Sequence, residues 1–390
     1  MKKISILGST GSIGRQTLAV VEALAGEFRV VGLAAGSNVE ELVGQIERHR
    51  PDVVSVATAS LASELAARLQ EKRVAPLPAI HHGREGMLAV GTHGAAEIVV
   101  SAAVGVVGLE ATYEAIKLGK VIALSNKEVL VAAGELVMAA VEKSGKELLP
   151  VDSEHNAVHQ CLRGGTHGEV LRIVLTASGG PFRKTPLKDL ASVTIEQALA
   201  HPNWRMGNRI TIDSATMMNK GFEVIEARWL FGVRPDQIEV VIHPQSTIHS
   251  MVEYVDGSVL AQLGPTDMRM PIQYALTYPA RVKTAEVHLD WGKLKRLDFE
   301  KASTRRFPCL RLAREAMKKG GAWPCALNAA DEVAVAAFLE GRLAFLGIAE
   351  VIERVLERTA KTKFGSMEDV LAADAEARRV ASEEVEKIRK

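Results

Sequence analysis

The sequence predicts an α/β protein with an N-terminal doubly wound, Rossmann-like domain, a central α+β catalytic domain and a C-terminal helical bundle. Three observations carry this prediction. A glycine-rich turn joins a short apolar strand to a helix at the N-terminus, and apolar runs then alternate with helical stretches to about residue 150. Beyond residue 308 the pattern is helical throughout.

Length and composition favour a multidomain protein of the cytoplasm. A chain of 390 residues is expected to hold two or three domains. Its 48 basic and 47 acidic residues leave no electrostatic footprint for nucleic acid or an anionic membrane. Cys161, Cys309 and Cys325 are widely spaced, which predicts neither disulfides nor a zinc site. Because no signal peptide or 18-residue apolar run is present, we expect a cytoplasmic protein.

The predicted first domain, residues 1–150, alternates strands with helices. We expect strands at 2–7, 29–35, 52–57, 97–103 and 120–125 and helices at 15–25, 39–50 and 109–118. This order predicts a parallel sheet covered on both faces.

The turn between the first strand and the first helix contains Gly8, Gly11 and Gly14. Glycines at such spacing let a pyrophosphate approach the backbone at a helix N-terminus. The alternative is a plain tight turn, but the strand before it and the helix after it favour a dinucleotide site.

The second strand ends at Ala35, Gly36, Ser37 and Asn38, without the acidic residue that binds the ribose of NAD. This absence favours NADP, with Ser37 and Asn38 as hydrogen-bond donors. Alternatively, Asn38 only begins the next helix.

Ser125, Asn126, Lys127 and Glu128 follow the strand at 120–125. This position is the carboxyl edge of the sheet, where doubly wound folds bind ligands. A lysine there can contact a carbonyl or a metal-bound oxygen. The alternative is a solvated loop before an ordinary helix.

Asp152 and Glu154 end a further apolar run, and on an extended segment two such acids would project to one side. A helical stretch further on places Asn219, Lys220, Glu223 and Glu226 on one face. Carboxylates without nearby cysteine suit Mg²⁺ or Mn²⁺ better than zinc. A salt-bridged helix surface is the alternative for that second face.

The predicted second domain, residues 151–282, contains an irregular stretch at about 178–208 of the kind that forms a flexible loop over a ligand. The donors of TASGGPF, with Ser214, Asn219 and Lys220, have the composition that a phosphate monoester requires. His201 and Trp204 lie in the loop, and we expect the tryptophan to cover a ligand or to pack on the linker.

The remaining elements are read from periodicity and capping residues. Strands are predicted at 171–177, 238–242, 247–255 and 258–263, and Thr194 with Gln197 predicts a capping box. Residues 283–308 are predicted to be a linker, and 309–390 a domain with helices at 310–319, 326–340, 348–360 and 366–389. Ser366 and Asp369 should cap the last helix.

Together these motifs resemble the 1-deoxy-D-xylulose 5-phosphate reductoisomerase family over essentially the whole chain. The matching segments are ILGSTGSIG, LSNKE, LLPVDSEHNA, TASGGPF, HPNWRMG, IDSATMMNKG, FEVIEARWLF, IHPQSTIHSM, DGSVLAQLG and CALNAADE.

The resemblance implies a role for each matching residue. NADPH would be bound by Thr10, Gly11, Ser12, Ile13, Gly36, Ser37, Asn38, Asn126, Glu128 and Gly207. The divalent metal, Mg²⁺ or Mn²⁺, would be held by Asp152, Glu154 and Glu223. The substrate would be contacted by Lys127, Ser153, Glu154, Ser178, His201, Trp204, Ser214, Asn219, Lys220 and Glu223, of which Lys127, Glu154, Glu223 and His201 are expected, with Asp152, to be catalytic. Ser37 departs from the basic residue that many relatives have at its position.

The implied reaction is the rearrangement of 1-deoxy-D-xylulose 5-phosphate, a small phosphorylated sugar-like substrate, to a branched aldehyde. Reduction by NADPH then gives 2-C-methyl-D-erythritol 4-phosphate for isoprenoid biosynthesis. Two alternatives remain: a simple NADPH-dependent reductase or semialdehyde dehydrogenase, and a non-catalytic NADP-sensing protein. The resemblance also implies a homodimer, for which the strands at 238–263 are the expected interface.

Overall fold

The computed structural model of the chain describes residues 1–103, 105–204, 207–283 and 287–388. Within these residues the chain forms two compact units. The first comprises Met1–Val129, Val137–Asn156 and Asp267–Val287, and the second comprises Leu130–Leu136, Ala157–Thr266 and His288–Lys390. The predicted division into domains at 1–150, 151–282 and 309–390 stays a prediction.

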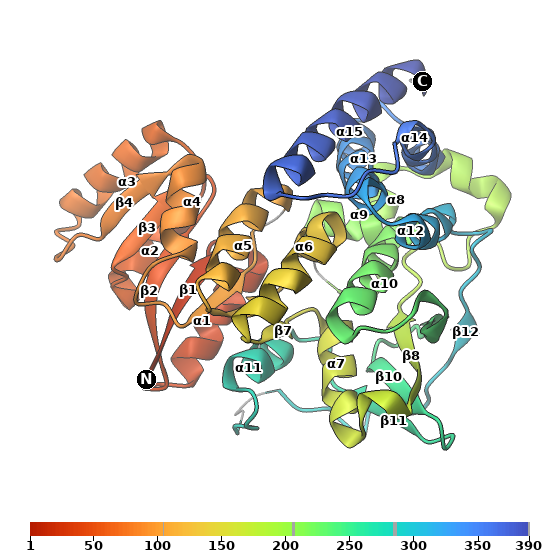
Figure 1. Cartoon of the computed structure of the whole chain (residues 1–390), viewed down its shortest axis with the longest axis horizontal. Coiled ribbons are helices and arrows are strands. Elements are labelled where there is room, and N and C mark those ends of the chain that lie inside the picture. Colours follow the sequence, from red (N-terminus) through yellow and green to blue (C-terminus); the bar gives the residue numbers. More distant parts are fainter. Residues whose placement is uncertain (104, 205–206, 284–286, 389–390) are drawn as a thin grey trace. The chain divides into compact units, whose positions relative to one another are not determined.

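The first unit is built on a seven-stranded parallel sheet of order β4-β3-β2-β1-β5-β6-β7 (Figure 1). Its strands are β1 (Lys2–Leu7), β2 (Phe28–Ala34), β3 (Val53–Val56), β4 (Ala79–His82), β5 (Ile98–Ser101), β6 (Val121–Leu124) and β7 (Leu148–Pro150). Its helices include α1 (Ser12–Ala23), α2 (Val39–His49), α3 (Ala59–Glu71), α4 (Gly83–Gly91), α5 (Leu109–Lys117) and α11 (Arg269–Thr277), and the short 3-10 turn η1 spans Gly105–Gly108. The strand order reverses beside β1, and folds of this kind bind their ligands at the carboxyl ends of the strands at such a point.

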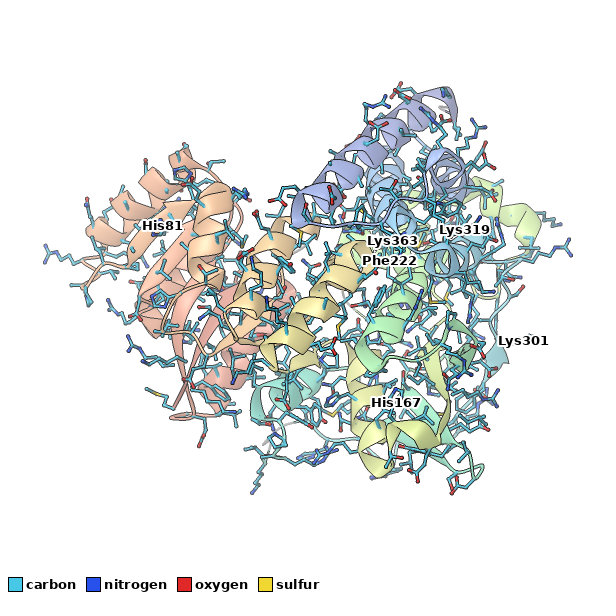
Figure 2. The ribbon with its side chains drawn as sticks, viewed as in Figure 1. His81, His167, Phe222, Lys301, Lys319 and Lys363 are labelled. Carbon is cyan, nitrogen blue, oxygen red and sulfur yellow. The ribbon has the colours of Figure 1, made fainter. Side chains whose placement is uncertain are left out.

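The core of this sheet follows from its sequence. The central strands read as continuous apolar runs, and Ile6, Leu33 and Leu42 are fully buried between the sheet and its helices. Strand β4 was not predicted, because it is a short edge strand whose sequence AIHH is largely exposed. Figure 2 shows His81 on this edge strand.

The second unit combines a mixed five-stranded sheet with helices. The sheet has the order β11-β10-β8-β9-β12, in which β8 and β9 are parallel and the other pairs are antiparallel. Its strands are β8 (Val170–Ala177), β9 (Ile238–Ile242), β10 (Ile248–Tyr254), β11 (Val259–Leu263) and β12 (Glu300–Lys301). The last of these comes from the predicted linker, of which residues 284–286 lie outside the described residues.

Helices cover the second sheet and form the C-terminal end of the chain (Figure 1). They are α8 (Ile195–Leu199), α9 (Asn208–Thr216), α10 (Met218–Phe231), α12 (Pro308–Lys319), α13 (Ala322–Leu339), α14 (Phe345–Arg358) and α15 (Met367–Ile388), with short 3-10 turns at Leu162–Gly164, His167–Glu169, Leu187–Ser192 and Pro235–Gln237. Phe222 of α10, labelled in Figure 2, is 2% exposed in the core of this unit. The predicted capping pairs are present, since Thr194 and Gln197 bond reciprocally, as do Ser366 and Asp369.

Two helices have residues in both units, α6 (Glu128–Ser144) and α7 (Ser153–Cys161). Helix α6 is kinked at Ala133, whose backbone is not helical. No helix among the described residues has the length and apolar character needed to cross a membrane.

Candidate active site

The glycine-rich turn at the end of β1 has the shape that a bound dinucleotide requires. Gly8 has φ +87°, and a Cβ on it would lie 2.5 Å from the Ala102 carbonyl oxygen. A Cβ on Gly14 would lie 2.3 Å from the Gly8 oxygen. The amides of Gly8 and Ser9 both donate to the Ala34 carbonyl at 2.8 Å, which joins the turn to the end of β2. The turn therefore tolerates only glycine at both positions.

The helix that follows the turn presents an anion-binding end. Gly11 is its N-cap and supplies no side-chain cap, and the first turn of α1 has no acidic residue. Gly11 and Ser12 are exposed, and Thr10 and Ile13 are half-buried. Unpaired amides at a helix N-terminus, with the helix dipole behind them, attract phosphate groups.

A buried glutamine that the sequence analysis did not single out supports this turn from α2. Gln45 is 4% exposed, and its Nε2 donates to the Ser9 carbonyl at 3.0 Å and to Glu41 Oε1 at 3.2 Å. The signal in the sequence was a polar residue on the apolar face of an amphipathic helix. An amide on that face has to find a buried partner.

Gly36, Ser37 and Asn38 follow β2 and are all exposed. The Asn38 side chain accepts a hydrogen bond of 3.1 Å from the Glu41 amide and so caps α2. Asn38 thus has the helix-capping role that was the alternative prediction for it. Ser37 lies in the exposed turn before it.

The segment after β6 is buried, so it is not the solvated loop that was the alternative prediction for it. Asn126 is 3% exposed, and its Nδ2 donates to the Gly105 carbonyl at 2.9 Å. Glu128, 8% exposed, accepts from the Gly105 amide at 3.2 Å. These two side chains therefore hold η1, the turn that follows β5. Lys127, between them, is also 8% exposed and forms an ion pair with Asp152.

Asp152, Ser153 and Glu154 follow β7, at the same edge of the sheet. They do not form the extended segment that was predicted, because Ser153 begins α7 and the Glu154 amide donates to Asp152 Oδ1 at 3.2 Å. An aspartate is a preferred residue at a helix N-terminus, and this preference overrides the strand pattern. A carboxylate oxygen of Asp152 still lies within 4.8 Å of one of Glu154. The Ser153 hydroxyl donates to Glu154 Oε2 at 2.5 Å.

In the second unit, α10 carries Asn219, Lys220 and Glu223 on one face, as predicted. The face is buried, with Glu223 at 0% and Lys220 at 2% exposure, so it is not a salt-bridged surface. Asn219 Nδ2 donates to Glu223 Oε1 at 2.7 Å, and Lys220 forms an ion pair with the other oxygen of Glu223. A buried carboxylate with two partners on its own helix is held in one rotamer.

The loop after β8 lies close to the C-terminal end of α9, the helix directly before α10. Gly179 and Gly180 both have positive φ, and a Cβ on Gly180 would lie 2.7 Å from the Ser214 carbonyl oxygen in α9. Ser178 Oγ accepts from the Gly180 amide at 3.2 Å. The fold therefore brings the loop of Ser178 close to the backbone of Ser214, as a shared phosphate site requires.

His201 organises the loop that contains Trp204. Its Nδ1 accepts from the backbone amides of Asn203 at 3.2 Å and Trp204 at 3.0 Å, so its Nε2 carries the proton and donates to Ser178 Oγ at 3.0 Å. Burial lowers the pKa of His201. The Trp204 ring lies 6.5 Å from the ring of His249. Gly207 is exposed and precedes α9, while residues 205 and 206 of the predicted loop lie outside the described residues.

A glycine turn of this kind on a parallel sheet, with a lysine and carboxylates at the same edge, defines a dinucleotide-dependent oxidoreductase. Residues 4–134 match the family described as 1-deoxy-D-xylulose 5-phosphate reductoisomerase, and residues 148–231 and 263–380 match its two C-terminal domain families. The chain belongs to the 1-deoxy-D-xylulose 5-phosphate reductoisomerase family.

Individual relatives agree over the full length. The reductoisomerase of Solibacter usitatus is 53% identical over 98% of this chain and 97% of its own, and that of Caldanaerobacter subterraneus is 54% identical over 97% and 98%. A solved Zymomonas mobilis reductoisomerase in complex with NADPH is 44% identical and covers 99% of both chains, with a TM-score of 0.92. Another, in complex with NADPH, fosmidomycin and magnesium, is 38% identical over 99% of this chain and 98% of its own, with a TM-score of 0.94. The predicted family and α/β fold are confirmed.

Proposed function

We propose that this chain is an NADPH-dependent, divalent-metal-dependent enzyme that converts 1-deoxy-D-xylulose 5-phosphate to 2-C-methyl-D-erythritol 4-phosphate in isoprenoid biosynthesis. Within the first unit, the observation that supports this activity best is the group formed by Lys127, Asp152 and Glu154. The group lies at the carboxyl ends of β6 and β7, in the same sheet whose first strand carries the dinucleotide turn. Family membership over the whole chain is the second support.

The residues present fit NADPH. The turn at Gly8 and Gly14 leaves space that a Cβ would fill, and the start of α1 has no acidic side chain. Two related structures contain NADPH. We assign the pyrophosphate to the backbone of Thr10, Gly11, Ser12 and Ile13 and the 2′-phosphate to the Gly36–Asn38 turn. We assign further contacts with NADPH to Asn126, Glu128 and Gly207.

The donor set also fits a hard divalent cation. Asp152 and Glu154 supply two carboxylates from the first unit, and we assign Glu223 as the third. Oxygen donors without thiolate or imidazole favour Mg²⁺ or Mn²⁺, and a related structure contains magnesium. When bound, such a cation polarises the substrate oxygens and stabilises negative charge during rearrangement and reduction.

The remaining residues bind and orient the substrate. We assign the phosphate to Ser178, Ser214, Asn219 and Lys220, which offer hydroxyl, amide and ammonium donors. Ser153 and Lys127 face the reacting end from the start of α7 and from the buried segment after β6. His201 and Trp204 close the loop over the substrate and exclude water from it.

We also propose that the protein is a homodimer and that it is located in the cytoplasm. Strand β11 is at the edge of its sheet, and Val259 and Leu260 on it are 50% and 40% exposed. An exposed apolar edge strand favours pairing with a second chain. Light scattering of the purified protein tests the dimer, and a Leu260→Lys variant should shift the equilibrium toward monomer.

One assay separates the proposed activity from its alternatives. NADPH oxidation is followed with 1-deoxy-D-xylulose 5-phosphate, with and without Mn²⁺ after treatment with a chelator. We expect NADPH oxidation only when both the substrate and Mn²⁺ are present, and we expect 2-C-methyl-D-erythritol 4-phosphate as the product. Oxidation that is independent of the metal indicates a simple reductase or semialdehyde dehydrogenase. NADPH binding without oxidation of any phosphorylated ketose indicates an NADP-sensing protein.

A further inference from the structure

The turn between β9 and β10, residues 243–247, is held in one conformation by the linker that leads to the C-terminal helices. His243 is 0% exposed, and its ring accepts from the Thr247 amide at Nε2 (3.2 Å) and donates from Nδ1 to the Asp298 carbonyl at 2.9 Å. Because an amide N–H only donates and a carbonyl only accepts, these partners fix which ring nitrogen carries the proton. Gln245 donates to the Asp298 carboxylate at 2.5 Å and accepts from its amide at 3.2 Å. The turn therefore presents its remaining polar groups in fixed positions.

Two of those groups accept hydrogen bonds from Asn203, which lies in the loop of His201. Asn203 Nδ2 is 2.6 Å from the Pro244 carbonyl oxygen and 2.9 Å from Ser246 Oγ. The atom that faces the carbonyl has to be the amide nitrogen, because a carbonyl oxygen cannot donate. Asn203 is half-buried and Ser246 is 9% exposed. An aspartate at position 203 would have the same shape, but it could not donate to the Pro244 carbonyl.

Ser246 has a backbone conformation that favours glycine. Its φ is +50°, in the left-handed region, where a Cβ is unfavourable. Glycine would adopt this conformation without strain. Strain of this kind is found at positions where a side chain has a function. At Ser246 the group that glycine would lack is the hydroxyl, which accepts the hydrogen bond from Asn203.

The backbone of Asn203 continues this connection to the proposed phosphate site. Its amide, like that of Trp204, donates to His201 Nδ1, and His201 Nε2 donates to Ser178 Oγ. Asn203 thus binds the turn through its side chain and the His201 ring through its backbone. All of these groups belong to the second unit. A shift of Asn203 displaces the ring from Ser178 or breaks its bonds, because a hydrogen bond weakens steeply outside its narrow range of distance and angle.

We propose that Asn203 is a positioning residue, which holds His201 against Ser178 by binding the turn at Pro244 and Ser246. The proposal rests on the proposed function, in which Ser178 binds the substrate phosphate and His201 lies over the substrate. Asn203 acts through His201 and is not a catalytic residue. Loss of its bonds to the turn lowers the affinity for the phosphorylated substrate. The affinity for NADPH stays unchanged, because the dinucleotide turn belongs to the first unit.

Steady-state kinetics of matched variants test this role. We expect Asn203→Ala to raise the substrate KM about tenfold, because two hydrogen bonds are lost together. Asn203→Asp, which keeps the shape without the donor, should raise it at least as much. Ser246→Gly removes one acceptor and permits the same backbone conformation, so the rise should be about threefold. The KM for NADPH should stay at the wild-type value in all three. Ser192→Gly, at an exposed serine of the stretch 178–208, is the control and should match wild type.

A double-mutant cycle between positions 203 and 246 separates positioning from a general loss of stability. In the Asn203→Ala background, Ser246→Gly should have no further effect on the substrate KM, because the bond that it removes is already lost. The two changes are then non-additive, as expected for groups that act through one contact. Independent losses of stability would add.

Two measurements without substrate test the connection from Asn203 to Ser178. Hydrogen exchange of the backbone amides of residues 203 and 204, which donate to His201, should be faster in Asn203→Ala than in wild type. Exchange in α14, a helix of the same unit, should keep its wild-type rate and exclude general unfolding. Inorganic phosphate, titrated by phosphorus NMR, should bind about tenfold more weakly to Asn203→Ala.

The outcomes distinguish this proposal from the proposed activity. Unchanged exchange at residues 203 and 204 in Asn203→Ala, additive effects in the cycle, or wild-type phosphate affinity in Asn203→Asp would each overturn the proposal. If the variants at position 203 do not fold, Ser246→Gly carries the same test, and wild-type exchange and phosphate affinity in it would overturn the proposal. Absence of turnover in wild type, with the exchange and phosphate effects both present, would overturn only the activity.

Discussion

His201 and Ser178 are joined by a hydrogen bond of 3.0 Å between Nε2 and Oγ, while Nδ1 of the same ring accepts from the backbone of Asn203 and Trp204. One neutral imidazole thus connects the proposed phosphate site to the loop. Protonation of Nδ1 would place an N–H donor against two amide donors, so the ring could no longer accept their hydrogen bonds and the connection would break.

We expect the loop to open at mildly acidic pH for this reason. Burial lowers the pKa of His201, so the unfolded chain takes up the proton before the folded one does. The stability that His201 contributes is present above the ordinary histidine pKa of about 6.5 and is lost as pH falls through the lowered value. Substrate KM and melting temperature, measured on both sides of that range, should show a step in wild type that His201→Asn lacks.

The control for this measurement is His81→Gln, which replaces an exposed histidine on edge strand β4. Its pH profile should match that of wild type. A step of equal size in His201→Asn would show that another group controls the loop.

Glu223→Gln should abolish turnover and leave NADPH affinity nearly unchanged. Glu223 belongs to the second unit, whereas the dinucleotide turn belongs to the first. Loss of one of three carboxylate ligands should lower kcat/KM by roughly 100-fold or more, most strongly at limiting Mn²⁺. Steady-state kinetics across a Mn²⁺ titration, together with fluorescence titration of NADPH, measure both effects.

Glu226→Gln is the matched control, because Glu226 is a carboxylate of the same helix with 2% exposure. Near-normal turnover of Glu223→Gln at limiting Mn²⁺, or an equal loss in the control, would remove Glu223 from the metal site.

The sequence allowed the dinucleotide turn to be predicted because every part of it is local. The strand, the glycines and the helix that form it all lie within the first 25 residues. The observed α1 begins at Ser12 and not at Arg15, since Gly11 is its N-cap. The acids of α10 were also predicted from helical spacing, but their burial was not, because it depends on packing against distant helices.

Contacts between distant segments could not be predicted. The ion pair of Arg209 and Glu332, with 3.2 Å between Nη1 and Oε1, joins α9 to α13, and neither helix indicates this partner by its own pattern. Strand β12 was missed because two residues within an aperiodic linker carry no strand signal. The helix at Asp152 was read as a strand because capping competes with an apolar run directly before it.

Gln45→Leu should weaken NADPH binding without changing turnover at saturating NADPH. The substitution nearly keeps the volume of the side chain but removes the amide that donates to the Ser9 carbonyl at 3.0 Å. An unsatisfied buried carbonyl costs about 1–3 kcal/mol of stability. We expect the turn to shift in response and the KM for NADPH to rise. Gln70→Leu, at an exposed glutamine of α3, is the control. A fall in kcat with an unchanged KM for NADPH would contradict a role in shaping the turn.

The last prediction concerns Ser37, which lies in the turn that we assign to the 2′-phosphate. Ser37 is exposed after β2, and Asn38 is committed to capping α2, so the 2′-phosphate has few side-chain donors in this turn. We expect a moderate preference for NADPH over NADH, because no acidic residue ends the strand. Ser37→Arg should tighten NADPH binding by roughly 1–3 kcal/mol through bidentate contact with the 2′-phosphate, and it should leave the affinity for NADH unchanged. The ratio of kcat/KM for the two cofactors in both proteins measures this. An unchanged ratio would mean that residue 37 does not face the 2′-phosphate, and a wild-type preference for NADH would overturn the cofactor assignment.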